Sequence, residues 1–391
     1  MSLRNVFGEW KCAAVLVCSV AVAIESSAAA PPTYRVDVLG SNIQAFAMNE
    51  RGDVAGRALD AAQIGKAFVI RDGGSLELLP LPAPWISSDA YAINLHGVVV
   101  GAVSTISIAS VGSHAAAWYP TESGYEFVLL GALPGHEFST ATDVNDLGDI
   151  VGGSGGLGLG MYNSAVLFAP GGPSVLPGLT LPGGVNNQRV VVASNQLLDL
   201  NTMTSTSVAL PPGNWQGMTS NDINNNNGIC GHIIGYSGCS TFPVRKLEGG
   251  AVEIIGGCAT TTSAVSMNDQ GDALTFVYNG GVGCVFIDGG YTNISGLIHP
   301  SQGQWVITSV GTINNARQLL VGGKKYPELI GQVIRLTPIG PGDLNNDGRV
   351  DGADLGMLLA GWGASGHPAD LDGNGTVNGA DLGMLLSMWS P

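Results

Sequence analysis

Between residues 33 and 340, apolar residues occur in short runs that are separated by Gly, Asn and Asp. Short apolar runs bounded by turn-forming residues indicate β-strands. Some runs, such as residues 98–100, are continuous and do not alternate with polar residues, which predicts strands covered on both faces. Charged residues make up 12% of the chain, too few to supply the charged outer faces of amphipathic helices. We therefore expect an all-β body.

A short phrase recurs along this body: an apolar residue and Asn, two variable residues, Gly, two or three apolar residues, and Gly. The clearest copies are residues 93–101 and 144–152. The Asn residues of the seven copies are Asn49, Asn94, Asn145, Asn186, Asn224, Asn268 and Asn314. In the fourth and seventh copies Arg189 and Arg317 replace the Gly, and the fifth copy is shifted by one residue. Asn favours the first corner of a type I turn, and Gly accepts the positive φ that closes a hairpin, so each phrase predicts a strand, a tight turn and a strand.

A third strand follows most copies, as in residues 114–118 and 164–168, and a fourth precedes a Leu-Pro-Gly-rich stretch. Four short strands in about 44 residues is the length of a propeller blade, so seven copies predict a seven-bladed β-propeller. The separate strand 33–39 would complete the last blade beside residues 332–336 and leave no sheet edge exposed. The alternatives are six or eight blades, a β-solenoid, or a pair of β-sandwiches.

The two recurring signals together resemble the bacterial extracellular repeats called HAF, after their His-Ala-Phe strand, over about residues 43–340. Only one copy, which begins His114-Ala115, keeps the His of that name. The resemblance implies secretion and brings no established catalytic residues.

The last fifty residues contain one twelve-residue pattern twice, at 343–354 and 370–381. Oxygen-bearing side chains at positions one, three, five, nine and twelve, with Gly at six, form the arrangement that calcium needs. We therefore predict two calcium ions, against the alternative of an acidic linker. The predicted ligand residues are Asp343, Asn345, Asp347, Arg349, Asp351 and Asp354 in the first loop, and Asp370, Asp372, Asn374, Thr376, Asn378 and Asp381 in the second.

Each loop leads into a short apolar helix, and no helix enters it. This duplicated unit resembles the dockerin module of cellulosome-type assemblies over residues 342–391, including Asp354 and Asp381 at position twelve. The resemblance implies a small α-helical calcium-binding domain that docks to a cohesin-like or other surface protein. Family dockerins bind mainly through positions ten and eleven, often Ser-Thr, where both copies here have Gly-Ala, so the partner does not carry over. Two nearly identical faces would permit binding in two orientations.

The tail should depend on metal for its folding. Fifty residues are too few for a self-sufficient core. The segment holds seven Asp and only one Arg, so its carboxylates repel one another without cations. Metal-binding energy would then be folding energy.

Residues 1–30 have the features of an export signal. Arg4 and Lys11 precede an apolar stretch at 12–24, and small residues at 28–30 offer a cleavage site. An uncleaved membrane anchor is the alternative, and no other segment is apolar enough to cross a membrane. The predicted organisation is a signal peptide (1–30), an HAF-like propeller (31–340) and a dockerin-like domain (341–391), in a secreted or cell-surface protein.

The cysteines that follow the signal are Cys230, Cys239, Cys258 and Cys284. An even number in an exported chain permits disulfides, with three possible pairings. Buried thiols are the alternative.

The sequence offers little for catalysis. No His shows metalloprotease spacing or stands beside a Ser nucleophile signature. Most Asp residues recur at equivalent repeat positions, which indicates turn chemistry. Three carboxylates do not recur and would be examined first for glycoside hydrolysis: Glu126, Glu137 and Asp199. The aromatic candidates for sugar platforms are Trp85, Trp118, Trp215, Trp305 and Tyr125, of which Trp118 ends a repeat strand and is expected in the core.

The chain has 15 basic and 30 acidic residues, a net charge of −15, which argues against nucleic acid and anionic membranes as partners. We expect a secreted binding or scaffold protein whose tail mediates calcium-dependent assembly, with a glycan as the candidate ligand of the propeller. One alternative is a dockerin-bearing carbohydrate-active enzyme, either an O-glycosyl hydrolase or a polysaccharide lyase, in polysaccharide degradation. Another is a structural repeat protein whose tail self-associates.

Overall fold

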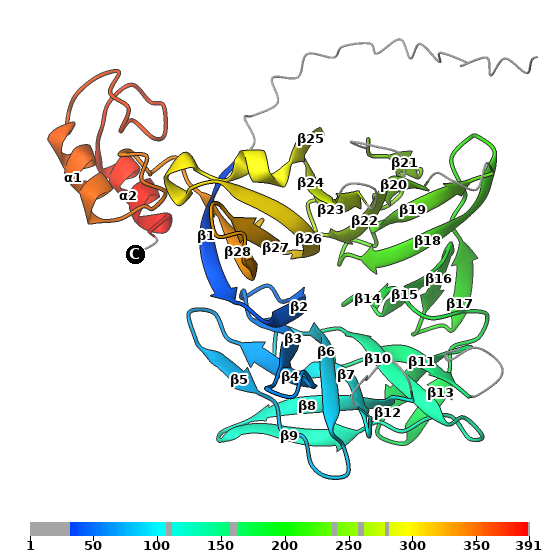
Figure 1. Cartoon of the computed structure of the whole chain (residues 1–391). Coiled ribbons are helices and arrows are strands. Elements are labelled where there is room, and N and C mark those ends of the chain that lie inside the picture. Colours follow the sequence, from blue (N-terminus) through cyan, green and yellow to red (C-terminus); the bar gives the residue numbers. More distant parts are fainter. Residues whose placement is uncertain are drawn as a thin grey trace, which may run out of the picture.

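The computed structural model describes residues 32–106, 112–156, 163–236, 241–256, 262–277 and 281–389. Its strands form seven antiparallel sheets of four strands each, arranged as blades around a central axis (Figure 1). The prediction of a seven-bladed all-β propeller is confirmed. The predicted export signal lies outside the described residues.

Blades 1 to 6 are each built from four consecutive strands. Blade 1 comprises β2 (Ile43–Met48), β3 (Val54–Leu59), β4 (Gly65–Ile70) and β5 (Leu76–Leu78); blade 2 comprises β6 (Ser87–Ile93), β7 (Val99–Ser104), β8 (His114–Thr121) and β9 (Gly124–Leu129); blade 3 comprises β10 (Phe138–Val144), β11 (Ile150–Gly155), β12 (Ser164–Ala169) and β13 (Gly172–Val175). Blade 4 comprises β14 (Gly184–Val185), β15 (Val190–Ala193), β16 (Gln196–Asp199) and β17 (Thr204–Ser207); blade 5 comprises β18 (Trp215–Ile223), β19 (Ile229–Gly235), β20 (Thr241–Lys246) and β21 (Glu253–Ile254); blade 6 comprises β22 (Thr262–Met267), β23 (Ala273–Val277), β24 (Val282–Ile287) and β25 (Gly290–Asn293).

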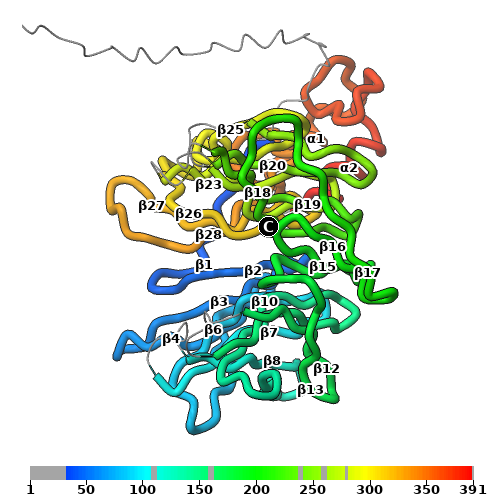
Figure 2. The backbone as a smooth tube through the Cα atoms, turned by 90° about the vertical axis from the view of Figure 1, so that its right-hand side faces the viewer, coloured from blue at the N-terminus to red at the C-terminus, as the bar shows by residue number. Residues whose placement is uncertain are grey.

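Blade 7 combines the two ends of the propeller. It comprises β26 (Trp305–Ile313), β27 (Leu319–Lys325), β28 (Gly331–Ile339) and, beside β28, β1 (Thr33–Gly40). The two strands run antiparallel, with Thr33 opposite Ile339 and Val36 opposite Leu336, and Figure 2 shows β1 in blue close to β28. The predicted closure of the last blade by residues 33–39 is confirmed.

The recurring phrase forms the turn between the first two strands of each blade. In blade 1, Gly52 donates its N–H to the Asn49 carbonyl over 3.0 Å, and the Asn49 side-chain oxygen accepts the N–H groups of Arg51 and Asp53. Gly52 has a φ of +86°. The three faint copies keep the same turn, because Arg189, Asn227 and Arg317 occupy this position with φ values of +64°, +56° and +57°.

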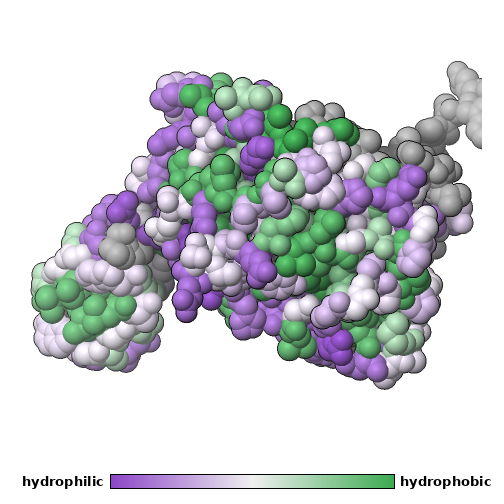
Figure 3. All heavy atoms as spheres, turned by 90° about the horizontal axis from the view of Figure 1, so that it is seen from below, coloured by the Kyte–Doolittle hydropathy of each residue, from purple (hydrophilic) through white to green (hydrophobic). Residues whose placement is uncertain are grey.

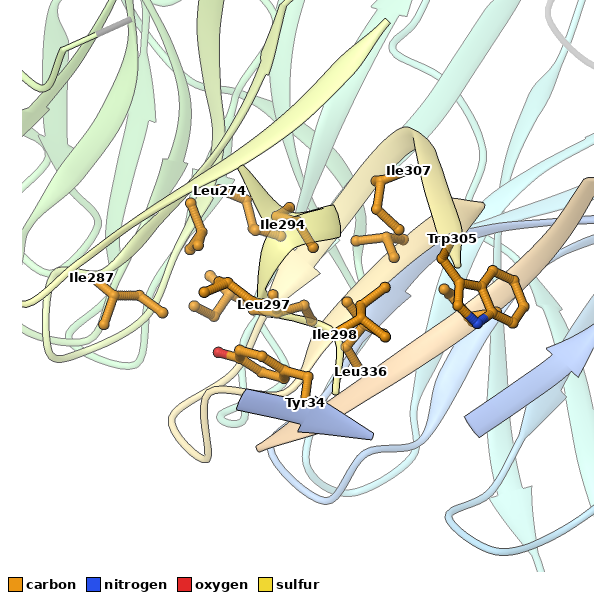
Figure 4. Close-up of a cluster of buried hydrophobic side chains, with 14 residues drawn as sticks. Tyr34, Leu274, Ile287, Ile294, Leu297, Ile298, Trp305, Ile307 and Leu336 are labelled. Carbon is orange, nitrogen blue, oxygen red and sulfur yellow. The ribbon is translucent and has the colours of Figure 1, made fainter. Parts of the chain in front are cut away.

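Hydrophobic cores fill the spaces between neighbouring blades. Figure 4 shows the cluster around blades 6 and 7, where the Tyr34 ring of β1 lies beside Leu297 and Leu336. Two short 3₁₀-helices, η1 (Ile294–Leu297) and η2 (Pro300–Gln302), connect these blades. Trp118 is fully buried between blades 1 and 2, as predicted, and its indole N–H donates to the Pro80 carbonyl over 2.9 Å.

The C-terminal lobe contains α1 (Gly352–Ala360) and α2 (Gly379–Ser387) and lies to one side of the propeller (Figure 1). Its core contains equivalent residues from both copies, namely Val350 and Val377, and Leu358 and Leu385. The Ser301 hydroxyl of η2 donates to the Asp347 carbonyl over 2.8 Å and so joins the first loop to the propeller. No helix in the described part of the chain has the length and hydrophobicity needed to cross a lipid bilayer.

Candidate functional site

The second C-terminal loop brings three carboxylates together. Oxygens of Asp370, Asp372 and Asp381 all lie within 4.8 Å of one another, which suits a single cation because calcium–oxygen distances of about 2.3–2.6 Å place two ligands at most ~5 Å apart. The Asp370 Oδ1 atom is buried and has no hydrogen-bond partner, whereas its Oδ2 accepts the Gly375 N–H over 2.8 Å. A buried carboxylate oxygen without a partner is costly unless a ligand satisfies it. The donor set is all oxygen, so it fits calcium.

The first loop has the same backbone pattern. Asp343 accepts the N–H groups of Asp347 and Gly348, and Asn345 accepts that of Asp347. These bonds hold the side chains at positions one and three against the loop. Gly348 has a φ of +91°, and a Cβ atom there would lie 2.7 Å from the Gln302 side chain, so position six needs Gly both for its turn and for its contact with the propeller.

The Asp at position twelve fixes each loop to its helix. Asp354 is fully buried and accepts three N–H groups, from Leu344, Asn345 and Asp351, and Asp381 accepts the three equivalent ones. Burial raises the pKa of Asp381. The hydrogen bonds from these N–H groups together lower it by more, so the net shift of the pKa is downward. The ionised form that a cation requires is therefore favoured in the folded loop.

A repeated hydrophobic pair is exposed at the end of each helix, with the Leu inside the helix and the Trp two residues beyond it. Leu359 and Trp362 follow the first loop and are 52% and 50% exposed, and Leu386 and Trp389, 27 residues later, are 51% and 38% exposed. Figure 3 shows hydrophobic residues gathered on the surface of this lobe. Large apolar side chains that remain exposed in pairs are typical of protein-binding surfaces.

A second arrangement, at the axis of the propeller, was not predicted as such. The side-chain NH₂ group of each phrase Asn donates to the carbonyl of the corresponding Asn in the next blade, over 2.8–3.4 Å. The seventh bond runs from Asn314 back to Asn49. The seven Asn residues therefore form a closed hydrogen-bonded ring.

Acidic side chains line the axial cavity, of about 190 Å³, beside this ring. Asp143 accepts the Val185 N–H and Asp222 accepts the Met267 N–H, each from the following blade. Burial raises the pKa of Asp143 to about 7, although these N–H bonds oppose the shift, and burial also raises the pKa of Asp222. Both carboxylates therefore join neighbouring blades.

The carboxylates considered for hydrolysis do not form a site. Glu126 is exposed on β9, Glu137 is exposed before β10, and Asp199 lies at the end of β16, so they belong to three different blades. The Asn201 N–H lowers the pKa of Asp199, which is opposite to the shift that a general acid needs.

The candidate sugar platforms differ in exposure. Trp85 and Trp215 are half-buried, the first against His114 and the second against Phe242. Trp305 is buried. Tyr125 lines an open cleft between blades 1 and 2.

The cysteine predictions are tested only in part. Cys230 is a buried free thiol on β19, and burial raises its pKa. The buried-thiol alternative therefore holds for Cys230. Cys284 is buried on β24. Cys239 and Cys258 lie outside the described residues.

Comparison with known proteins gives no family. No family model matches the chain and no curated protein matches it. Solved structures with similar chains include virginiamycin B lyase from Staphylococcus aureus (11% identity, 78% of this chain and 100% of that chain, TM-score 0.48) and a streptogramin B lyase (12%, 78% and 98%, 0.47). A sialidase from Trypanosoma rangeli is also similar (11%, 81% and 62%, 0.36). With TM-scores below 0.5, these likenesses identify no activity for this chain.

Proposed function

We propose that this chain is an exported binding protein whose C-terminal lobe holds two calcium ions and, once loaded, docks to a partner protein. The observation that carries the proposal is the second loop, where three carboxylates converge and Asp370 Oδ1 is buried without a hydrogen-bond partner. The first loop repeats the same turns with Asp343, Asn345 and Asp354. A bound ion would neutralise the carboxylates of its loop and satisfy that oxygen.

The exposed pairs Leu359/Trp362 and Leu386/Trp389 support docking through the helices. Because the two pairs are equivalent, a partner that recognises one of them could also recognise the other. The propeller would then be the cargo that the lobe attaches. No observation in the described residues favours the enzyme alternative over this one.

Calorimetric titration of the full chain tests the metal proposal. After chelation and buffer exchange, we expect calcium to bind with a stoichiometry of two and to increase the helical circular dichroism of the lobe. Asp370→Asn should reduce the stoichiometry to one, and Asp343→Asn should do the same for the other loop. Glu122→Gln, an exposed acidic residue of the propeller, is the control and should leave both ions in place. A full chain that gives no heat at millimolar calcium would rule the proposal out.

Capture from an envelope extract of the native organism tests docking. The calcium-loaded chain should retain a partner that chelator releases. Replacing Leu359 and Trp362 by Ala should leave capture largely intact, since the second pair remains, and replacing all four residues should abolish it. Equal capture by the fourfold variant would contradict docking through these helices.

A further inference from the structure

A cleft of about 500 Å³ opens between blades 1 and 2, on the face that carries the Asn turns. Its lining residues come from two neighbouring turns, from the end of β4 and from the β8–β9 hairpin: Arg51, Asp53, Arg71, Asp72, His96, Gly97, Pro120 and Tyr125. A volume of this size accommodates a small ligand of one or two rings.

The cleft holds a guanidinium group that no carboxylate neutralises. Among the residues that the structure describes, every other arginine of the propeller has a carboxylate within ion-pair distance: Arg35, Arg51, Arg57, Arg189, Arg245, Arg317 and Arg335. Arg71 instead lies over the Tyr125 ring, with 5.6 Å between the guanidinium carbon and the ring centre. In a chain with a net charge of −15, Arg71 keeps a positive charge at the surface of this cleft.

The two acidic residues of the cleft already have partners. Asp53 accepts the Asn49 side chain, Arg51 and the Asp72 N–H, and Asp72 is paired with Arg335. The charge available to a ligand is therefore that of Arg71, with the exposed His96 across the cleft.

Comparison of the blades shows that these residues are not needed for the fold. Two residues after the phrase Asn, blades 1 and 2 have Arg51 and His96, whereas the other blades have Leu147, Gln188, Asn226, Gln270 and Ala316. In each blade, one residue of the third strand lies opposite the first residue of the second strand, and Arg71 directly follows that residue in blade 1. The equivalent positions in the other blades hold Tyr119, Ala169, Leu200, Leu247, Ile287 and Thr337. Basic side chains thus occur at these two positions only in two adjacent blades, and there they line one cleft.

Gly97 lines the cleft and has no side chain. A Cβ atom on Gly97 would lie 3.7 Å from the Arg51 guanidinium, 3.7 Å from the Tyr125 hydroxyl and 3.8 Å from the Pro120 ring. A side chain at this position would fill the part of the cleft beside the Tyr125 hydroxyl and the Arg51 guanidinium. An aromatic face packs against the C–H face of a sugar ring, and a guanidinium binds a carboxylate with two parallel hydrogen bonds.

We propose that this cleft binds an acidic sugar, with the sugar ring on Tyr125 and its carboxylate on Arg71. The site lies on blades 1 and 2 and does not involve the C-terminal lobe, so it stands or falls independently of calcium binding.

Calorimetric titration of the full chain with sodium galacturonate and with a galacturonate trimer tests this site. We expect binding that weakens as salt is raised, and at least about 10-fold weaker binding of neutral galactose, because galactose lacks the carboxylate that would pair with Arg71. Arg71→Gln should weaken uronate binding by about 10-fold or more. Lys324→Gln, which removes the same charge from an exposed site on β27, should have no effect.

Tyr125→Leu separates the sugar from a simple anion. It should weaken galacturonate binding and leave any weak binding of acetate unchanged. The proposal would be overturned by an absence of uronate binding at about 50 mM, by equal affinity of the Arg71→Gln variant, or by acetate and phosphate binding as tightly as galacturonate. Both arginine and lysine sites are exposed, so circular dichroism should show that each variant is folded.

Discussion

At the scale of single residues, the propeller places polar side chains where they join blades. Asp143 and Asp222 occupy equivalent positions, and each accepts a backbone N–H from the next blade. Arg189 and Arg317 adopt a positive φ that side chains rarely adopt, and each forms an ion pair with the preceding blade, to Asp149 and Asp272. The ion pairs offset the backbone strain of these two turns.

Asp143 should make stability depend on pH. Its pKa is raised to about 7 in the folded state and lies near 3.9 when unfolded, so between these values the folded chain holds a proton that the unfolded chain releases. The free energy of unfolding should therefore fall as pH rises from about 4 to 7, by at most about 1.4 kcal/mol per pH unit. Urea unfolding across this range should show a shallower slope for Asp143→Asn.

The matched control is Asp149→Asn. Desolvation raises the pKa of Asp149, but hydrogen bonds from Arg189 and Asn145 lower it below its usual value, so its stabilisation is present above about pH 4 and is lost only at lower pH. This variant should keep the slope between pH 4 and 7. Identical slopes for Asp143→Asn and the unmodified chain would contradict the assignment.

At the scale of elements, β1 is the strand whose position matters most. It covers the edge of β28 and places Tyr34, fully buried, in the cluster shown in Figure 4. The Tyr34 hydroxyl is buried without a hydrogen-bond partner, and burial raises its pKa. The ring therefore contributes through packing and the hydroxyl does not.

Two substitutions separate these contributions. Tyr34→Ala should lower the free energy of unfolding by about 3–5 kcal/mol, because it removes a large buried ring. Tyr34→Phe should be neutral or slightly stabilising, because it removes only the unpaired hydroxyl. Chemical denaturation measures both, and a loss of several kcal/mol in Tyr34→Phe would show that the hydroxyl has a partner.

The sequence predicts elements where the signal is local. The Asn phrase contains its own turn, so even the copies with Arg189, Asn227 and Arg317 could be placed. The twelve-residue loops likewise contain all their predicted ligands. The outermost strands are less readable, since β21 is only Glu253–Ile254 and is defined by its pairing with β20. The cleft could not be predicted, because Arg71 and Tyr125 meet only when two blades pack side by side.

At the scale of the whole molecule, the seven Asn residues join all the blades near the axis, and β1 joins the two ends of the propeller in blade 7. Each of them is buried and bonds both its own turn and the next blade. The sequence shows seven turns but not the bonds between them, because these depend on how many blades complete a circle.

Asn224→Ala tests the ring. It would remove the bond to the Asn268 carbonyl and leave the N–H groups of Asn226 and Gly228 without the side-chain oxygen they share. We expect a loss of about 3 kcal/mol, since buried backbone groups would be left unpaired. Asn214→Ala, in an exposed loop, should change stability by less than about 0.5 kcal/mol. Similar urea midpoints for both variants would mean that the ring does not stabilise the fold.

The pairing of Thr33 with Ile339 has a consequence for how the protein is made. A strand synthesised at the start must wait for its neighbour until about three hundred residues later, and contacts so distant in sequence form slowly. The predicted calcium loops begin at Asp343, four residues after β28 ends. The partner that we propose for residues 342–391 would therefore meet only chains in which all seven blades have already been synthesised.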